Sequence, residues 1–373
     1  MYITAVAVWS DSSSNMVIIA IIVIILKLYY SNNIELISPI HDKNDRTFPE
    51  KKRNNQSKFL FRNLFVLRSQ SFTVMYIATG LELEKSLNIA LETGYRFIDT
   101  AIGYNNEPII GKVLNEWISA GKVTRDELFI LTKLPCYGNR PEDVDKFIKQ
   151  SLHDLQLDYI DMYLVHLPIG LFKNGKSEYS EMELDKSTDH LKIWKKMEEQ
   201  VHNGRTKSIG LSNFNIKQTQ RIIDNCKIRP DSLQNENHLY FQSPDVVEFC
   251  KHNGIILISY SSLGMKAFRE AAGLSWNNKQ LPEMLENDVL VKIAKKHSKT
   301  PAQVLLRFIN QKGISVIPKS TCPRRIMENF QIFDFKLNTE DMDALRNQDD
   351  GEAGRIVRFQ MIKNIEDHPE YPF

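Results

Sequence analysis

Short apolar runs alternate with amphipathic stretches from about residue 72 to the end of the chain. The runs have the length and residue types of strands, and the stretches between them carry apolar residues at helical spacing. This alternation is typical of βαβ units and a parallel sheet. Eight strands are predicted, over residues 73–78, 96–100, 128–133, 159–165, 208–211, 232–234, 255–260 and 314–317. Helices are predicted over residues 81–92, 107–120, 141–155, 189–203, 216–225, 244–252 and 301–310.

The eight predicted strands favour an α/β fold, a single (β/α)8 TIM barrel with its active site at the C-terminal face of the strands. An open doubly wound sheet is the alternative, and it would carry a glycine-rich turn after its first strand. The sequence contains no G-x-G-x-x-G and no P-loop, so any dinucleotide would be held in another way. Two long stretches, residues 167–188 and 261–286, follow predicted strands and would overhang this face as binding loops.

The N-terminal part of the chain differs from the barrel, which we assign to residues 72–373. Residues 1–30 form an apolar segment with an unbroken apolar run at 16–26, and residues 31–71 read as a polar linker. Residues 16–30 are shorter than the roughly 20 residues of a membrane span. A membrane anchor, a cleaved signal and a dispensable extension all stay open. We expect a cytoplasmic protein, with membrane contact through residues 16–30 as an alternative and secretion less favoured.

Composition and charge restrict the partners of the protein. The chain is 42% hydrophobic and 25% charged with a net charge of +2, which is ordinary for a globular protein and too balanced to argue for nucleic acid. The four cysteines form no C-x-x-C pair and no Cys/His ligand spacing: Cys136, Cys226, Cys250 and Cys322. We therefore expect reduced thiols and no metal site.

An acid, a phenol, an amine and an imidazole lie at or just after predicted strand ends: Asp99, Tyr104, Lys133 and His166. Such strand ends carry the chemistry of a barrel. A phenol donates its proton sluggishly at pH 7, and a nearby ammonium makes it more acidic by stabilising the phenolate. Asp99 would keep Lys133 charged, and His166 would hydrogen-bond a substrate oxygen. Singly, each residue is more often a cap, a salt-bridge partner or packing, but together they predict a proton-donating site.

Ordered motifs resemble those of the aldo-keto reductase family over residues 72–373. They are GYRFIDTAIGYNNE, LFILTK, DMYLVH, GLSNFN, QNENH, ISYSSLG and VIPKSTCPRRIMENF. Residues 139–170 are most similar to arthropod members of the 3-dehydroecdysone-reductase-like and aldose-reductase-like branch, some of which reduce oxidised ecdysteroids. The resemblance implies NADPH-dependent reduction of aldehydes or ketones to alcohols by a monomer, with ecdysteroid ketones among the candidate substrates.

Residue by residue, the resemblance implies a catalytic tetrad of Asp99, Tyr104, Lys133 and His166, with Tyr104 as proton donor. The nicotinamide contacts would be Ser212, Asn213, Gln234 and Tyr260, and the pyrophosphate contacts Ser261 and Leu263. The 2′-phosphate contacts would be Lys319, Ser320 and Arg325, and the adenine contacts Glu328 and Asn329. Two cations and a hydroxyl beside a predicted helix start at Pro323 suit a dianionic phosphate, although they would also suit a solvated face.

The chain departs from the family pattern in its first strand. Ala78, Thr79 and Gly80 stand where a Gly-Thr pair and a pocket-lining aromatic are usual, and Phe97 stands where a histidine is common. This departure motivates a rival hypothesis, an NADPH-binding barrel with little turnover that acts as a sensor or scaffold. A barrel lyase or isomerase is a third reading, because a fold alone does not fix function.

Overall fold

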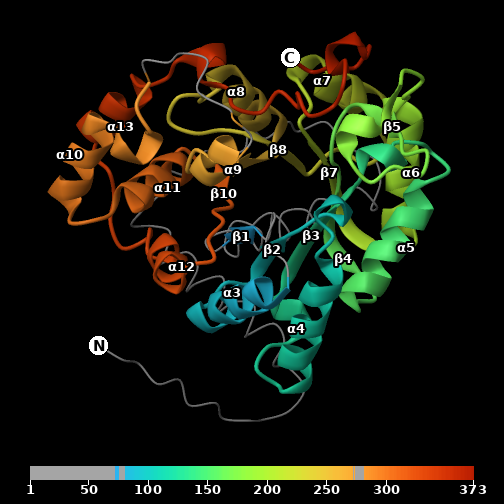
Figure 1. Ribbon diagram of the computed structural model, residues 1–373, viewed down its shortest axis with the longest axis horizontal. Helices are drawn as coiled ribbons and strands as arrows, with labels where there is room; N and C mark the ends of the chain where they lie inside the picture. Colours follow the sequence, from blue (N-terminus) through green and yellow to red (C-terminus); the bar gives the residue numbers. More distant parts are fainter. Residues whose placement is uncertain (1–71, 75–79, 272, 274–280) are drawn as a thin grey trace, which may run out of the picture. The chain divides into compact units, whose positions relative to one another are not determined.

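Eight parallel strands form one sheet in the computed structural model, which describes residues 72–74, 80–271, 273 and 281–373 (Figure 1). The strand order is β1-β2-β3-β4-β7-β8-β9-β10, so each strand pairs with the strand of this sheet that follows it in sequence. The predicted eight strands and the (β/α)8 barrel are confirmed. The strands are Phe72–Val74, Phe97–Asp99, Phe129–Leu134, Ile160–Val165, Thr206–Ser212, Ser232–Glu236, Ile256–Tyr260 and Ser315–Val316.

Helices connect the strands, as the alternating pattern predicted. Those expected from the sequence are α3 Gly80–Thr93, α4 Glu107–Ser119, α5 Val144–Leu155, α6 His190–His202, α7 Ile216–Asn225, α8 Pro244–Asn253 and α11 Pro301–Gln311. Helix α12, Pro323–Phe330, begins at the proline where a helix start was expected. Three further helices were not predicted: α9 Lys266–Ala271, α10 Asp288–His297 and α13 Thr339–Arg346.

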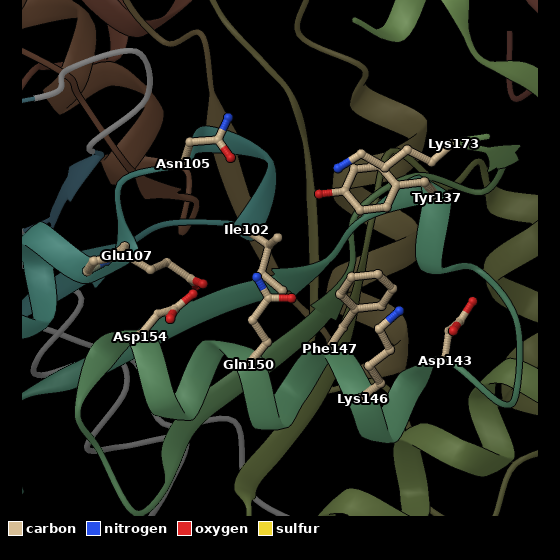
Figure 2. A pocket seen from close by; sticks show the side chains of 11 residues that line it. Ile102, Asn105, Glu107, Tyr137, Asp143, Lys146, Phe147, Gln150, Asp154 and Lys173 are labelled. Atoms are coloured by element: carbon tan, nitrogen blue, oxygen red, sulfur yellow. The ribbon is translucent and has the colours of Figure 1, made fainter. Parts of the chain in front are cut away.

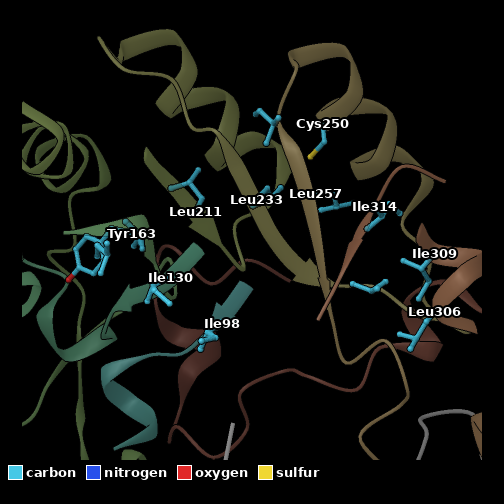
Figure 3. Close-up of a cluster of buried hydrophobic side chains, with 14 of the residues drawn as sticks. Ile98, Ile130, Tyr163, Leu211, Leu233, Cys250, Leu257, Leu306, Ile309 and Ile314 are labelled. Atoms are coloured by element: carbon cyan, nitrogen blue, oxygen red, sulfur yellow. The ribbon is translucent and has the colours of Figure 1, made fainter. Parts of the chain in front are cut away.

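Strands β2, β3 and β4 are buried on both faces, which fits the strands of a parallel barrel. Phe97, Leu131 and Leu164 belong to a small cluster inside the sheet, while the alternate residues Ile98 and Ile130 join the large cluster under the helices (Figure 3). Successive side chains of a strand point to opposite faces, which explains this division. Phe97, at a position where a histidine was noted as common, packs edge to face on Phe129 with ring centroids 4.8 Å apart.

Both long stretches begin at the C-terminal ends of strands, as expected, but the first contains an unpredicted hairpin. Strands β5 Gly170–Phe172 and β6 Glu183–Asp185 pair antiparallel. Asn139 Nδ2 donates to the carbonyl oxygens of Leu167 and Ile169, at 2.7 Å each, which anchors the start of this loop. The second stretch contains α9 and the turn Met284–Glu286. Asn139, which follows β3, therefore holds the start of the first loop in place.

Three predicted features lie outside the described residues: the apolar segment 1–30, the linker 31–71 and the altered residues 78 and 79 of the first strand. Within the described ranges, no helix has both the length and the apolar character needed to cross a membrane. All four cysteines are free thiols, as expected, with Cys136 and Cys250 buried. In the same ranges, no cluster of His, Cys, Asp or Glu is placed to hold a metal ion.

Candidate active site

The parallel topology brings the four proton-transfer residues to one end of neighbouring strands. Asp99 is the last residue of β2, Lys133 is the second-last of β3, and His166 follows the end of β4. These three strands are adjacent in the sheet. Tyr104 ends the short 3-10 turn Ile102–Tyr104 after β2. Residues spread over 68 positions of sequence thus meet at the C-terminal face of the sheet.

Lys133 is the hub of this group, and its ammonium is fully buried. Its Nζ lies 2.5 Å from Asp99 Oδ1, 2.9 Å from the carbonyl oxygen of Thr100 and 3.3 Å from the hydroxyl of Tyr104. Burial lowers the pKa of Lys133, and the carboxylate of Asp99 opposes this shift. The ion pair therefore keeps a positive charge beside the phenol in a site where an unpaired ammonium would be costly.

His166 lies on the other side of the Tyr104 hydroxyl, with Nε2 3.4 Å from that oxygen. Burial, followed by the charge of Lys133, lowers the pKa of His166 well below its ordinary value. The imidazole is therefore neutral at pH 7. A neutral imidazole has one N–H donor and one acceptor nitrogen, so the tautomer with the proton on Nε2 can donate a hydrogen bond to a substrate oxygen.

The residues assigned to the nicotinamide are joined to the tetrad by hydrogen bonds. Gln234 Nε2 donates to Asp99 Oδ2 at 2.7 Å, and Asn213 Nδ2 donates to the carbonyl oxygen of His166 at 2.8 Å. Ser212 Oγ donates to the carbonyl oxygen of Gln234 at 3.0 Å, and the Tyr260 hydroxyl donates to Asn213 Oδ1 at 2.6 Å. These polar groups form one network with the tetrad at the ends of β7, β8 and β9.

Asn213 adopts a left-handed backbone conformation, with φ of 65°. Asparagine is among the few non-glycine residues that adopt this conformation readily. Its backbone N–H donates to Asn235 Oδ1 at 2.9 Å, which fixes the turn. Asn213 and Tyr260 also line a cavity of about 570 Å³ that reaches Phe241, Arg355 and Phe373. The chain therefore turns sharply at the end of β7, and the side-chain amide of Asn213 is held between His166 and Tyr260.

The predicted phosphate contacts lie after β10, next to β9 in the sheet. Lys319 and Arg325 are exposed, and neither forms an ion pair with a carboxylate of the described chain. Ser320 Oγ accepts from the backbone N–H of Cys322 at 3.2 Å, just before α12. Two unpaired cations and a hydroxyl at a helix start fit the dianionic 2′-phosphate of NADPH.

The other predicted contacts differ in their surroundings. Asn329 is buried, and Glu328 is half-buried with its carboxylate 3.7 Å from Arg324 Nε. Ser261 and Leu263 are half-buried at the turn after β9, where Ser261 has a positive φ of 56°. The expected pyrophosphate contacts thus lie on the turn after β9, and the expected adenine contacts lie in α12, which also carries Arg325.

Sequence reasoning missed one buried carboxyl near the tetrad, Glu107. It is the first residue of α4, and Ile110 and Leu114 follow at helical spacing on the same buried face. Thr132 Oγ1 donates to Glu107 Oε1 at 2.5 Å, and Ser151 Oγ lies 3.0 Å from Oε2. Burial raises the pKa of Glu107 to about 7. An acidic residue on an apolar helical face was the signal that could have revealed it.

Comparisons with known proteins agree with this geometry. Residues 80–350 match the model of the aldo/keto reductase family. The chain is 40% identical to dihydrodiol dehydrogenase 3 of Bos taurus over 300 residues, which are 79% of this chain and 88% of that protein. It is also similar to the crystal structure of a Bombyx mori aldo-keto reductase in complex with NADP, with a TM-score of 0.72, 32% identity and coverage of 81% and 94% of the two chains.

A further similar structure is an aldo-keto reductase complexed with NADPH, with a TM-score of 0.71 and 35% identity, covering 81% of this chain and 89% of that one. The family match covers most of the chain, and the parallel barrel is the fold of these neighbours. The residues at the strand ends also fit a nicotinamide dinucleotide with a 2′-phosphate. The chain therefore belongs to the aldo/keto reductase family and is an NADPH-dependent oxidoreductase that reduces carbonyl compounds.

Proposed function

We propose that Asp99, Tyr104, Lys133 and His166 are the catalytic residues of this reductase and that Tyr104 is the proton donor. The observation that carries the proposal is the position of the Tyr104 hydroxyl, 3.3 Å from Lys133 Nζ and 3.4 Å from His166 Nε2. One buried cation and one imidazole thus face the same phenol. A positioned proton donor of this kind serves general acid catalysis at an oxygen that gains charge.

Each residue has a distinct role in the proposed reaction. Tyr104 gives its proton to the substrate oxygen, and the ammonium of Lys133 stabilises the phenolate that remains. Asp99 holds that ammonium in place through its 2.5 Å contact. His166 is neutral, so it can orient the carbonyl by a hydrogen bond without adding a second positive charge beside Lys133. Bound NADPH supplies the hydride that reduces the carbonyl carbon.

We further propose the residues that hold the cofactor. Donors on the network at the ends of β7 and β8 support binding of the nicotinamide carboxamide. The unpaired cations Lys319, before α12, and Arg325, in its first turn, support binding of the 2′-phosphate. The proposed contacts are Ser212, Asn213, Gln234, Tyr260, Ser261, Leu263, Lys319, Ser320, Arg325, Glu328 and Asn329.

Replacing Tyr104 with phenylalanine tests the catalytic proposal. Tyr104→Phe should lower kcat on a panel of aldehydes and ketones by about 10²-fold or more, because the proton donor is lost. NADPH binding, followed by quenching of intrinsic fluorescence, should be retained. Tyr159→Phe is the matched control, since the Tyr159 hydroxyl bonds to Asp126 away from the site. Turnover retained in Tyr104→Phe would remove Tyr104 from this role.

We also propose that the natural substrate is an oxidised ecdysteroid ketone. The similarity of residues 139–170 to the arthropod branch, some of whose members reduce oxidised ecdysteroids, supports this choice. We expect the purified protein to reduce ecdysteroid ketones with a higher kcat/KM than small aldehydes. Reduction of small aldehydes alone would reject the steroid substrate, and NADPH binding without turnover of any carbonyl would favour the sensor or scaffold reading.

A further inference from the structure

Glu107 is a buried carboxyl that the proposed proton transfer does not use. It lies three residues after Tyr104 in the chain and is only 2% exposed. Ser151 Oγ lies 3.1 Å and 3.0 Å from its two oxygens, and Thr132 Oγ1 donates to Oε1 at 2.5 Å. Burying a carboxyl is unfavourable unless its hydrogen bonds compensate. Its position therefore calls for an explanation beyond helix packing.

The hydrogen bond from Thr132 places Glu107 on the face of β3 opposite to the Lys133 side chain. Thr132 and Lys133 are consecutive residues of β3, so their side chains point to opposite faces of the sheet. Thr132 faces the helix layer and Glu107, whereas Lys133 faces Tyr104. The strand that carries the ammonium is thus held from its outer side by a residue on the chain segment that carries the phenol.

These contacts close a ring around the catalytic pair. The ring runs from Tyr104 along the chain to Glu107, across the hydrogen bond to Thr132, on to Lys133, and back to Tyr104 over 3.3 Å. The other end of the loop is tied as well, since the carbonyl oxygen of Thr100 accepts from Lys133 Nζ at 2.9 Å. Hydrogen bonds to β3 therefore fix both ends of the segment that carries Tyr104.

Packing supports this loop incompletely on its outer side. A cavity of about 450 Å³ borders the loop and is lined by Ile102, Asn105 and Glu107 together with side chains of α5. Figure 2 shows Glu107 and Asp154 at one end of this cavity and Tyr137 towards the other. The outer side of the loop therefore borders open space, and the hydrogen bond from Thr132 contributes to holding the loop in position.

We propose that Glu107, through its hydrogen bond to Thr132, is a positioning residue that sets the separation between the Tyr104 hydroxyl and the Lys133 ammonium. The inference rests on the proposed function, since this separation matters for turnover only if these two groups transfer the proton. Small displacements of reacting groups are costly, and a 1 Å error lowers rates by about 10²-fold.

Three variants of the full chain test the proposal. Thr132→Val keeps the shape of the side chain but removes the donor, and it should lower kcat by about 10- to 100-fold with KM and NADPH affinity nearly unchanged. Thr132→Ser restores the hydroxyl and should recover most of this loss. Ser151→Ala is the matched control, because it removes another hydrogen bond to Glu107 while the bond from Thr132 remains, and its kcat should stay close to that of the wild type.

Hydrogen exchange gives a readout that does not need turnover. The backbone amides of residues 101–106 should exchange faster in Thr132→Val than in the wild type, Thr132→Ser or Ser151→Ala. If exchange is faster in Thr132→Val but the wild type reduces no carbonyl, the inference of a hydrogen-bonded ring stands and the proposed function is overturned instead. Wild-type kcat in folded Thr132→Val overturns the positioning role, whatever the exchange shows.

A fourth variant, Glu107→Gln, keeps the test decisive if Thr132→Val does not fold. Glu107→Gln replaces a charge-assisted hydrogen bond with a neutral one of similar shape, and charge-assisted bonds are roughly twice as strong. At pH 8 it should lower kcat by about threefold or more, with KM unchanged. An unchanged kcat at pH 8 in the folded variant contradicts the proposal.

Discussion

Glu107 also shows how one residue can make stability depend on pH. Burial, aided by the charge of Asp154, raises the pKa of Glu107 from 4.5 to about 7, although Thr132, Ser151 and Lys133 oppose this shift. The folded-state pKa lies above the unfolded one, so this contribution to stability is fully present below pH 4.5 and is lost as pH rises through 7. A shift of this size corresponds to about 3 kcal/mol.

The variant Glu107→Gln should lack this pH dependence. Between pH 4.5 and pH 8, the free energy of unfolding of the wild type should fall by about 3 kcal/mol more than that of the variant. Urea unfolding of both proteins at the two pH values measures the difference. Two curves that fall in parallel would show that Glu107 does not titrate in this range.

At the scale of residues, the sequence predicted where side chains lie in the fold better than which hydrogen bonds they form. Asp99, Lys133 and His166 could be placed together because the ends of neighbouring parallel strands share one edge of the sheet. The bond between Gln234 and Asp99 joins residues 135 positions apart, and it depends on the register and side-chain directions of the curved parallel sheet. Sequence patterns carry neither quantity, so this contact and the Thr132–Glu107 bond were not foreseen.

At the scale of elements, a close approach of α4 to α5 positions Glu107 beside Ser151. A Cβ on Gly111 of α4 would lie 2.4 Å from the carbonyl oxygen of Asp154 on α5, so only glycine fits at this crossing. Gly111→Ala should push the helices apart and lower the free energy of unfolding by about 1–3 kcal/mol. It should also lower kcat, because Glu107 moves with α4.

Thermal or urea unfolding measures the cost of this substitution, and steady-state kinetics measures its effect on turnover. Glu116→Ala on the exposed face of α4 is the control and should change both by little. Unchanged stability in Gly111→Ala would mean that α4 can shift without loss, which the backbone contact with α5 argues against.

Two of the elements that sequence patterns missed, α13 and the β5–β6 hairpin, are short or depend on distant contacts. Helix α13 has eight residues, of which only Met342 and Leu345 are buried hydrophobics, so a periodicity window of 11–18 residues sees little signal. Each strand of the β5–β6 hairpin has three residues. Arg140 holds this hairpin through a 2.7 Å contact with Asp185, a pairing that local sequence does not reveal.

At the scale of the whole molecule, the proposed cofactor contacts come from the successive strands β7, β8, β9 and β10 and from α12. Replacing both Lys319 and Arg325 with alanine should raise the dissociation constant of NADPH by about 10²-fold or more, because charge-assisted bonds to the 2′-phosphate are lost. NADH, which lacks this phosphate, should bind almost as before. Fluorescence titration with both cofactors measures the ratio.

Arg324→Ala provides the control for that experiment, since Arg324 lies beside Arg325 but has Glu328 as a partner. Equal weakening of NADPH and NADH in the double variant would argue against a 2′-phosphate site.

The monomeric state, the cytoplasmic location and the roles of residues 1–30 and 31–71 stay predictions at this scale.

The placing of the tetrad and the long loops on different segments has a consequence for engineering. The tetrad rests on β2, β3 and β4, while the long stretches 167–188 and 261–286 leave the sheet after β4 and β9. The proposed proton-transfer residues and the long loops over which we expect a substrate to bind therefore lie in different stretches of the sequence. Grafting these two segments from a relative with another preferred carbonyl should retarget the enzyme, while the scaffold that activates the phenol is inherited unaltered.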